Sequence, residues 1–165
     1  LKPFDNKKLL NKVNSYLVKN NEEKDENRSI FERNLNSFKT NLSLEINRSS
    51  RSDVPVTVGK FESKKEININ KIKRVKEGIT EIIRDIDQVY VVSQDTFILL
   101  LPLTDKEGFE TLCERLKEFV KEFINNLENI IEITVITFPE DITDKKDVTK
   151  INDYRKEVLN TLKIE

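Results

Sequence analysis

The feature that most constrains the fold is the apolar run Phe97–Leu103, which reads FILLLPL. It is interrupted by Pro102 and is far shorter than the roughly 20 residues that a membrane-spanning helix needs. The run therefore predicts a strand in a soluble protein. The segment VYVV precedes it across Ser93-Gln94-Asp95-Thr96, and this spacing predicts a β-hairpin with a short loop.

The N-terminal third of the chain has helical periodicity. Apolar residues predict a helix over residues 5–19, after Pro3. Residues 20–28, NNEEKDENR, have no apolar period and are either a linker or a solvated part of one continuous helix. A second helix follows and ends before Pro55. Its predicted buried stripe comprises Ile30, Phe31, Leu35, Phe38, Leu42 and Ile46.

The rest of the chain alternates between strand and helix patterns. A strand is predicted at Val54–Phe61, and an isoleucine stripe predicts a helix that ends near Ile86. After the hairpin we expect a helix from Lys106 to about Asn126, a strand at Ile130–Phe138, and a last helix from about Lys146 to Leu162. This order predicts an α/β (α+β) domain with a central sheet and helices on its faces.

The composition excludes several classes of function. The 29 basic and 30 acidic residues leave a net charge of −1, so no global field favours nucleic acid or an anionic membrane. Histidine is absent, which excludes histidine-dependent triads and histidine-bound metal sites. The single cysteine, Cys113, fits a reducing, cytoplasmic compartment and a packing role. The lysine-rich stretches 7–12 and 145–150 are interpreted as solvated helix surfaces. The lack of methionine predicts that the chain is a fragment of a longer protein.

The segment from Ile82 to Leu116 resembles the central region of GGDEF domains, the fold of diguanylate cyclases; it reads IIRDIDQVYVVSQDTFILLLPLTDKEGFETLCERL. In that family an arginine and an aspartate precede a Gly-Gly-Asp/Glu-Glu-Phe hairpin, and a leucine-rich strand, a proline and an arginine-bearing helix follow. VGKFESKKEIN falls where the family has a strand ending in Asp-x-Asp-x-Phe-Lys-x-Ile-Asn, and TFPED resembles its later Pro-x-Asp turn. The resemblance implies a nucleotidyl-cyclase-like, mainly antiparallel sheet flanked by helices.

The N-terminus, LKPFDNKKLLNKVNSYL, looks like the end of a receiver domain, in which a Lys-Pro-Phe segment opens the last helix. Lys2 then corresponds to the switch lysine of that domain; a basic residue before a helix-starting proline is the alternative reading. The domain organisation implied is the last receiver helix at 1–19, a linker at 20–28, and a degenerate GGDEF domain at 29–165. This arrangement is typical of a bacterial response regulator.

The resemblance implies that catalytic chemistry has been lost. In the family, carboxylates on the first strand and in the hairpin hold divalent metal against GTP. Here Lys60 occupies the first-strand position, Ser93-Gln94 replace the glycine pair, and Thr96 replaces the glutamate. Asp95 keeps a carboxylate position but reads most simply as a turn residue.

Asn68 stands where the family has an asparagine that contacts guanine, and it does not restore catalysis. We therefore expect no enzyme activity, no metal and no cofactor.

A binding function is implied to survive. The motif Arg84-Asp85-Ile86-Asp87 precedes the hairpin at the spacing of the family's inhibitory Arg-x-x-Asp site, and Arg115 falls where a second arginine completes that site. Guanidinium groups suit phosphate and guanine, and a carboxylate accepts from guanine N–H groups. The resemblance thus implies a cyclic di-GMP site at Arg84, Asp87 and Arg115. The alternative is structural, in which Arg84 complements a helix C-terminus, Asp87 makes a turn and Arg115 is a solvated helix residue.

Three functions remain open at this point. The first is a cyclic di-GMP receptor, and the second is a ligand-free interaction or dimerisation module that acts through the N-terminal helix, giving a homodimer. The third is a weak diguanylate cyclase or a GTP-binding allosteric domain, against which Lys60 and the missing glycine pair argue. Neither nucleic acid nor a membrane is expected as a partner.

Overall fold

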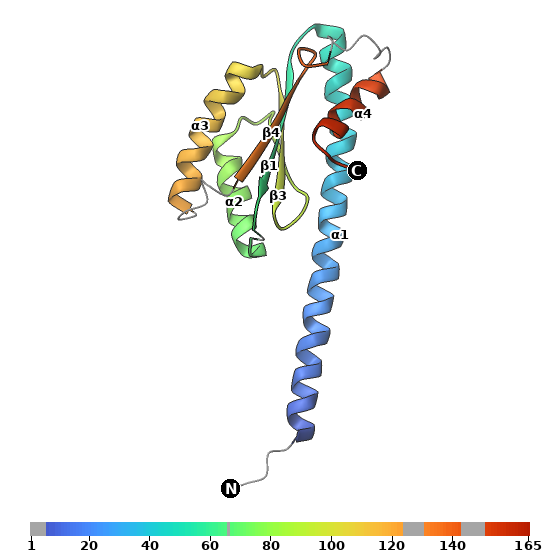
Figure 1. Cartoon of the computed structure of the whole chain (residues 1–165), viewed down its shortest axis with the longest axis vertical. Helices are drawn as coiled ribbons and strands as arrows, with labels where there is room; N and C mark the ends of the chain where they lie inside the picture. The colour runs from blue at the N-terminus through green and yellow to red at the C-terminus, as the bar shows by residue number, and fades with distance from the viewer. Residues whose placement is uncertain (1–5, 66, 124–130, 143–150) are drawn as a thin grey trace.

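The structure, a computed structural model, describes residues 6–65, 67–123, 131–142 and 151–165. A long helix opens the chain, and strands and helices alternate after it (Figure 1). The elements are α1 (Asn6–Ser52), β1 (Val56–Ser63), α2 (Ile69–Ile82), β2 (Gln88–Val91), β3 (Thr96–Pro102), α3 (Lys106–Phe123), β4 (Ile131–Phe138) and α4 (Ile151–Thr161).

The four strands form one antiparallel sheet in the order β2-β3-β1-β4. Helices α2 and α3 cover one face, while α1 and α4 lie against the other (Figure 1). The predicted fold class, a mainly antiparallel sheet flanked by helices with an N-terminal helical extension, is therefore confirmed.

Each face of the sheet has its own hydrophobic core, because successive side chains of a strand point to opposite faces. In β3, Leu99 and Leu101 pack towards α2 and α3, whereas Ile98 and Leu100 pack towards α1 and α4. All four side chains are fully buried. The run FILLLPL is therefore apolar throughout because helices cover both faces of β3.

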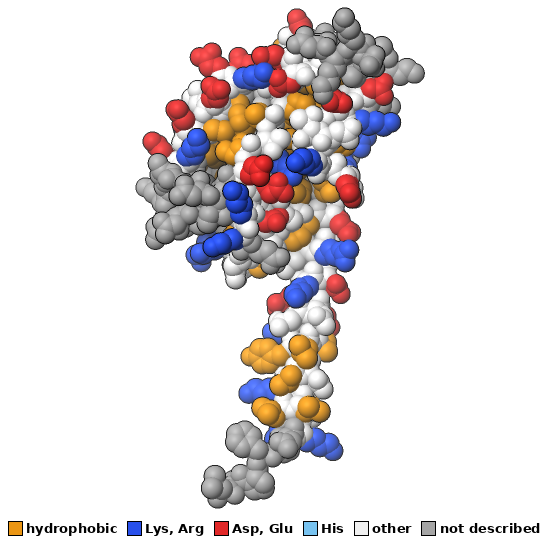
Figure 2. Space-filling model, viewed as in Figure 1, with side chains coloured by type: hydrophobic (Ala, Val, Ile, Leu, Met, Phe, Trp, Pro, Cys, Tyr) orange, Lys and Arg blue, Asp and Glu red, His pale blue; other side chains and the backbone are white. Residues whose placement is uncertain are grey.

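Helix α1 is continuous from Asn6 to Ser52. Residues 20–28 are therefore a solvated part of one continuous helix and not a linker. Its C-terminal part packs on the sheet through Phe38, Leu42 and Ile46, all fully buried. Its N-terminal part projects beyond the domain and carries exposed apolar side chains (Figures 1 and 2). None of the described helices is long and apolar enough to cross a membrane.

The helix that was expected to end near Ile86 ends at Ile82, which corrects that prediction. The strands expected at 54–61, 89–92 and 97–103 are shifted by one or two residues, to 56–63, 88–91 and 96–102. The expected end of α3 near Asn126 and the start of the last helix near Lys146 lie outside the described residues, as does the lysine-rich stretch 145–150.

Candidate functional site

The loop between α2 and β2 carries two of the predicted binding residues. After Ile82 the backbone becomes extended at Ile83, with φ −79° and ψ 164°. The N–H of Arg84 donates to Asp87 Oδ2 (3.0 Å), although in a continuing helix it would donate to the carbonyl of Thr80. The carboxylate of Asp87 thus replaces a helical hydrogen bond. Arg84 consequently lies in the loop after α2, and not in the helix that the sequence predicted to continue to near Ile86.

Arg84 and Asp87 form a two-point ion pair. Arg84 Nε and Nη2 donate to Asp87 Oδ2 and Oδ1 at 3.0 and 2.8 Å. The side chain of Asp87 is only 4% exposed, whereas that of Arg84 is 52% exposed. The hydrogen bond to Asp87 raises the pKa of the Arg84 guanidinium, against the lowering effect of partial burial. The ion pair is neutral as a whole, and it fixes the orientation of the charged Arg84 guanidinium at the surface.

Arg84 also joins this loop to the end of β3. Its Nη2 donates to the carbonyl of Pro102 (2.8 Å) and to Thr104 Oγ1 (2.6 Å), and Thr104 is buried. Sequence reasoning missed Thr104 because its contact depends on how the loop folds across the sheet. Arg84 Nη1 makes no hydrogen bond to any part of the chain that the structure describes. That nitrogen remains free to bind a ligand.

Arg115 reaches the same region from α3. Its side chain is exposed, and Nη2 donates to the carbonyl of Ile82 (2.9 Å), one of the last carbonyls of α2. A shallow pocket of about 180 Å³ contains Arg84, Asp87 and Arg115. Its other lining residues are Ile82, Leu103, Thr104, Asp105, Gly108 and Leu112. The structure thus brings the three predicted binding residues together, two from the loop between α2 and β2 and one from α3.

The arrangement can present two guanidinium groups to one anionic ligand. Charge-assisted hydrogen bonds to phosphate oxygens are the chemistry that guanidinium groups favour. Asp87 is already committed to Arg84, so its main effect is to orient that arginine. Both arginines also have structural partners, which means that part of the structural alternative considered from the sequence is observed as well.

The hairpin loop uses its polar groups internally. Asp95 Oδ1 accepts hydrogen bonds from Ser93 Oγ and from Thr96 Oγ1, the latter at 2.8 Å. The carbonyls of Gln94 and Asp95 accept from Ile67 N (3.1 Å) and Ser63 N (2.7 Å). Asp95 is therefore a turn residue, as the simpler reading of the sequence predicted.

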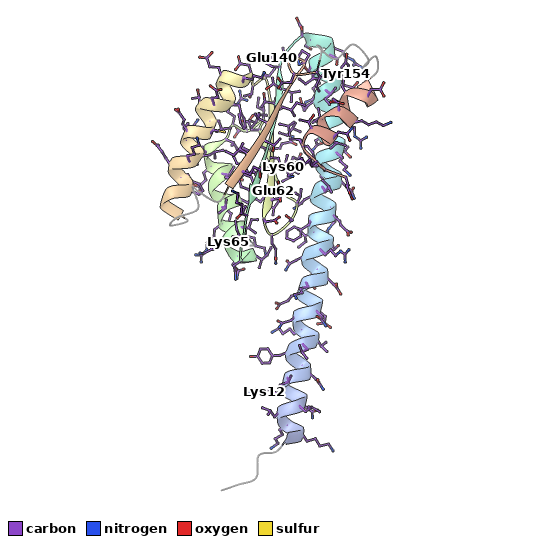
Figure 3. The ribbon with its side chains drawn as sticks, in the orientation of Figure 1. Lys12, Lys60, Glu62, Lys65, Glu140 and Tyr154 are labelled. Carbon is purple, nitrogen blue, oxygen red and sulfur yellow. The ribbon has the colours of Figure 1, made fainter. Side chains whose placement is uncertain are left out.

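The two other positions compared with a cyclase site are also engaged. Lys60 is 7% exposed, and its Nζ lies 3.0 Å from Glu62 Oε2 on the same strand (Figure 3). Asn68 is the N-cap of α2, where its Oδ1 accepts from Asn70 N at 2.9 Å. Within the described residues, no cluster of three or more acidic or cysteine side chains is placed to hold a metal ion.

A cleft of about 370 Å³ separates the hairpin loop from α1. Ser93, Gln94 and Asp95 form one wall, and the residues of α1 on the other wall are Lys24, Asn27, Arg28 and Phe31. Neither Lys60 nor Asn68 lines this cleft. Of the positions compared with a cyclase site, those of the hairpin loop therefore line the cleft, whereas Lys60 and Asn68 do not.

Comparison with known proteins identifies the fold. No protein-family model and no curated protein matches the sequence. Among solved structures, a DGC protein from Thermotoga maritima is 23% identical with a TM-score of 0.53, covering 78% of this chain and 91% of that one. Residues 156–455 of PelD from Pseudomonas aeruginosa PA14, in the apo form, are 15% identical with a TM-score of 0.55, covering 81% of this chain and 48% of that one.

The diguanylate cyclase SiaD from Pseudomonas aeruginosa, solved with its activator SiaC, is 12% identical with a TM-score of 0.53. The match covers 94% of this chain and 70% of SiaD. At these identities the likeness concerns the fold alone. The chain has the α+β fold of the GGDEF, diguanylate cyclase-like domains, with its four-stranded antiparallel sheet and flanking helices.

Proposed function

We propose that this chain is a catalytically inactive GGDEF-type signalling domain of a cytoplasmic bacterial response regulator, and that it binds cyclic di-GMP at Arg84, Asp87 and Arg115. The observation that carries the proposal is the pocket in which these three residues meet. Arg84 is held by Asp87 with one nitrogen free of intramolecular hydrogen bonds, and Arg115 is exposed beside it. A dianionic ligand with guanine bases suits this pair of cations.

The proposed loss of catalysis is supported by the residues at the cyclase positions. Lys60 brings a buried positive charge, paired with Glu62, to a position where the family holds metal with a carboxylate. The carboxylate of Asp95 is occupied by the turn that it stabilises. Ser93 and Gln94 add side chains where the family has glycines. Purified protein with GTP and Mg²⁺ or Mn²⁺ is therefore expected to form no cyclic di-GMP.

The binding proposal is tested by calorimetric titration with cyclic di-GMP. Arg115→Ala is the informative variant, because its arginine contacts only one backbone carbonyl. A lost charge-assisted hydrogen bond is worth about 1.5 to 3 kcal/mol, which predicts roughly ten- to a hundredfold weaker binding. Arg84→Ala should weaken binding similarly, and rising salt concentration should weaken binding of the wild type.

The matched control is Arg28→Ala, which removes an exposed arginine at the hairpin cleft and should leave the affinity unchanged. Circular dichroism and thermal melting establish that each variant is folded. Absence of binding to the wild type, or equal affinity of the wild type and Arg115→Ala, contradicts the proposal. Weaker binding only in Arg28→Ala would place the ligand at the hairpin instead.

A second candidate function is a ligand-free interaction module that dimerises through α1. The observation that favours it is the apolar stripe of Leu9, Leu10, Val13, Tyr16 and Leu17, whose side chains are 48–65% exposed. Val13 and Phe31 are 18 residues apart (31 − 13), about five helical turns. The stripe therefore lies on the same face of α1 as the residues that pack on the sheet, and a partner helix would lie on that side.

A further inference from the structure

Strand β4 lies at the edge of the sheet, so every second residue points its backbone N–H and C=O groups away from β1. Thr137 N donates to Asp141 Oδ2 (2.7 Å), and Asp141 N donates to the carbonyl of Thr137 (2.8 Å). Thr137 therefore points both its backbone groups away from β1. Ser63 of β1 donates to Asp95 on the β3 side, which fits the same alternation.

Because backbone groups alternate along an antiparallel ladder, Ile131, Ile133 and Val135 point their N–H and C=O groups outwards as Thr137 does. The backbone groups of Ile133 and Val135 that face outwards have no partner in the described parts of the chain. The side chains of Ile133 and Val135 are 38% and 40% exposed. The edge thus combines unpaired backbone groups with exposed apolar side chains.

Within β4 itself, two residue types that usually prevent strands from pairing are absent. Proline and lysine, which commonly protect an edge strand, do not occur between Ile131 and Phe138. Glu132 is the only charged residue of the strand. Asp141 covers only the end at Thr137. An outer strand can therefore extend the sheet without displacing any observed contact of Ile133 or Val135.

We propose that β4 pairs in antiparallel fashion with β4 of a second copy of this chain, with Ile133 opposite Ile133 of the second copy. The outward groups require an extended strand as their partner, and β4 supplies one by a twofold rotation. In this register Ile131 faces Val135 of the second copy, so Ile131, Ile133 and Val135 all pair. The ladder ends before Thr137, whose outward groups are bonded to Asp141, on both strands. Glu132 then faces Thr134 of the second copy.

A shift by two residues, which places Ile131 opposite Ile133 of the second copy, would bring the two Glu132 side chains directly opposite each other, and like charges at that spacing are unfavourable. The opposite shift, which pairs Ile133 with Val135 of the second copy, brings the second strand against the Thr137–Asp141 contact. The register centred on Ile133 avoids both conflicts.

The test is disulfide trapping with Ile133→Cys in a Cys113→Ser background. In an antiparallel ladder, two opposite residues that exchange both backbone hydrogen bonds have Cα atoms about 5.5 Å apart, and this distance suits a disulfide. Glu140→Cys, an exposed position beyond the paired stretch, is the matched control. Mild oxidation should convert Ile133→Cys into a covalent dimer at least tenfold faster than Glu140→Cys.

Val135→Pro, added to Ile133→Cys, should abolish trapping. Proline removes the outward N–H of residue 135 but no hydrogen bond to β1. Val135→Thr keeps that N–H and should trap normally. Equal rates for Ile133→Cys and Glu140→Cys, no trapping of Ile133→Cys, or trapping that survives Val135→Pro in a folded protein each overturn the proposal.

Discussion

Cys113 packs in the core between the sheet and helices α2 and α3. Burial raises the pKa of its thiol to about 11, from an ordinary value of 9.0. The thiol is therefore a packing group, as the sequence suggested, and its neutral form is the one that the fold accommodates.

This raised pKa predicts a pH-dependent stability. The unfolded chain loses the thiol proton near pH 9, whereas the folded chain keeps it until about pH 11, so the contribution is complete below pH 9 and is lost as the pH rises towards 11. Between pH 8 and pH 10, urea denaturation should show a loss of about 1 kcal/mol that Cys113→Ala does not show. Other groups titrate equally in both proteins, so an identical pH dependence in the two would refute the assignment.

The predicted site residues illustrate what the sequence could and could not establish at this scale. The expectation that Arg84, Asp87 and Arg115 meet came from a family spacing, and the pocket contains all three. The hydrogen bonds from Arg84 to Pro102 and Thr104 had no sequence signal, because they join residues 18 and 20 positions apart. Whether the ligand binds there stays a prediction.

At the scale of elements, the contact between α2 and α3 depends on the absence of a side chain at Gly78. A Cβ atom at this buried position would lie 1.9 Å from Cζ of Phe119. A side chain at this position would therefore force the Phe119 ring to move, which favours glycine here despite its lower helix propensity.

Gly78→Ala should consequently destabilise the protein. Overpacking of a core costs about 1 to 3 kcal/mol, and the gain in helix propensity of up to about 1 kcal/mol offsets only part of it. Chemical denaturation should show a net loss, and the loss should be smaller when Gly78→Ala is made in a Phe119→Leu background, since a smaller side chain relieves the clash. Equal losses in both backgrounds would show that the ring is not the cause.

The order of the elements was predictable because each has a clear apolar period, but their ends were less so. α2 ends four residues earlier than predicted because the carboxylate of Asp87 accepts the hydrogen bond from Arg84 N–H. Asp87 lies outside the apolar stripe, so the periodicity could not reveal this end. The continuity of α1 was open for a similar reason. Residues 20–28 have no apolar side chains to reveal a period, yet charged residues sustain a solvated helix.

At the scale of the whole molecule, the apolar stripe on the projecting part of α1 predicts self-association. Double substitution of Leu10 and Leu17 by Glu should lower the average mass in sedimentation equilibrium, because charges on the stripe oppose burial. Val18→Glu is the control, since Val18 is 56% exposed but lies about 140° around the helix from Val13, the centre of the stripe.

These measurements belong in a Val135→Pro background, so that pairing at β4 does not contribute. The hypothesis of an interface on α1 fails if the protein with the wild-type stripe is monomeric at high concentration. It also fails if the Val18→Glu variant dissociates as readily as the double variant. The position of Lys12, on the projecting part of the helix in Figure 3, shows how far this surface stands from the sheet.

The unbroken path of α1 couples distance to angle. Each residue of a continuous helix adds about 1.5 Å of length and about 100° of rotation, so the 47 residues of α1 form a rod of about 70 Å. The number of residues between the N-terminal end of α1 and the sheet therefore fixes the direction, around the helix axis, in which any structure attached to that end points. Removing seven residues from the solvated stretch would shorten the rod with only about 20° of net turn, whereas removing five would swing the attached part to nearly the opposite bearing. The length of this helix is therefore also a setting of direction.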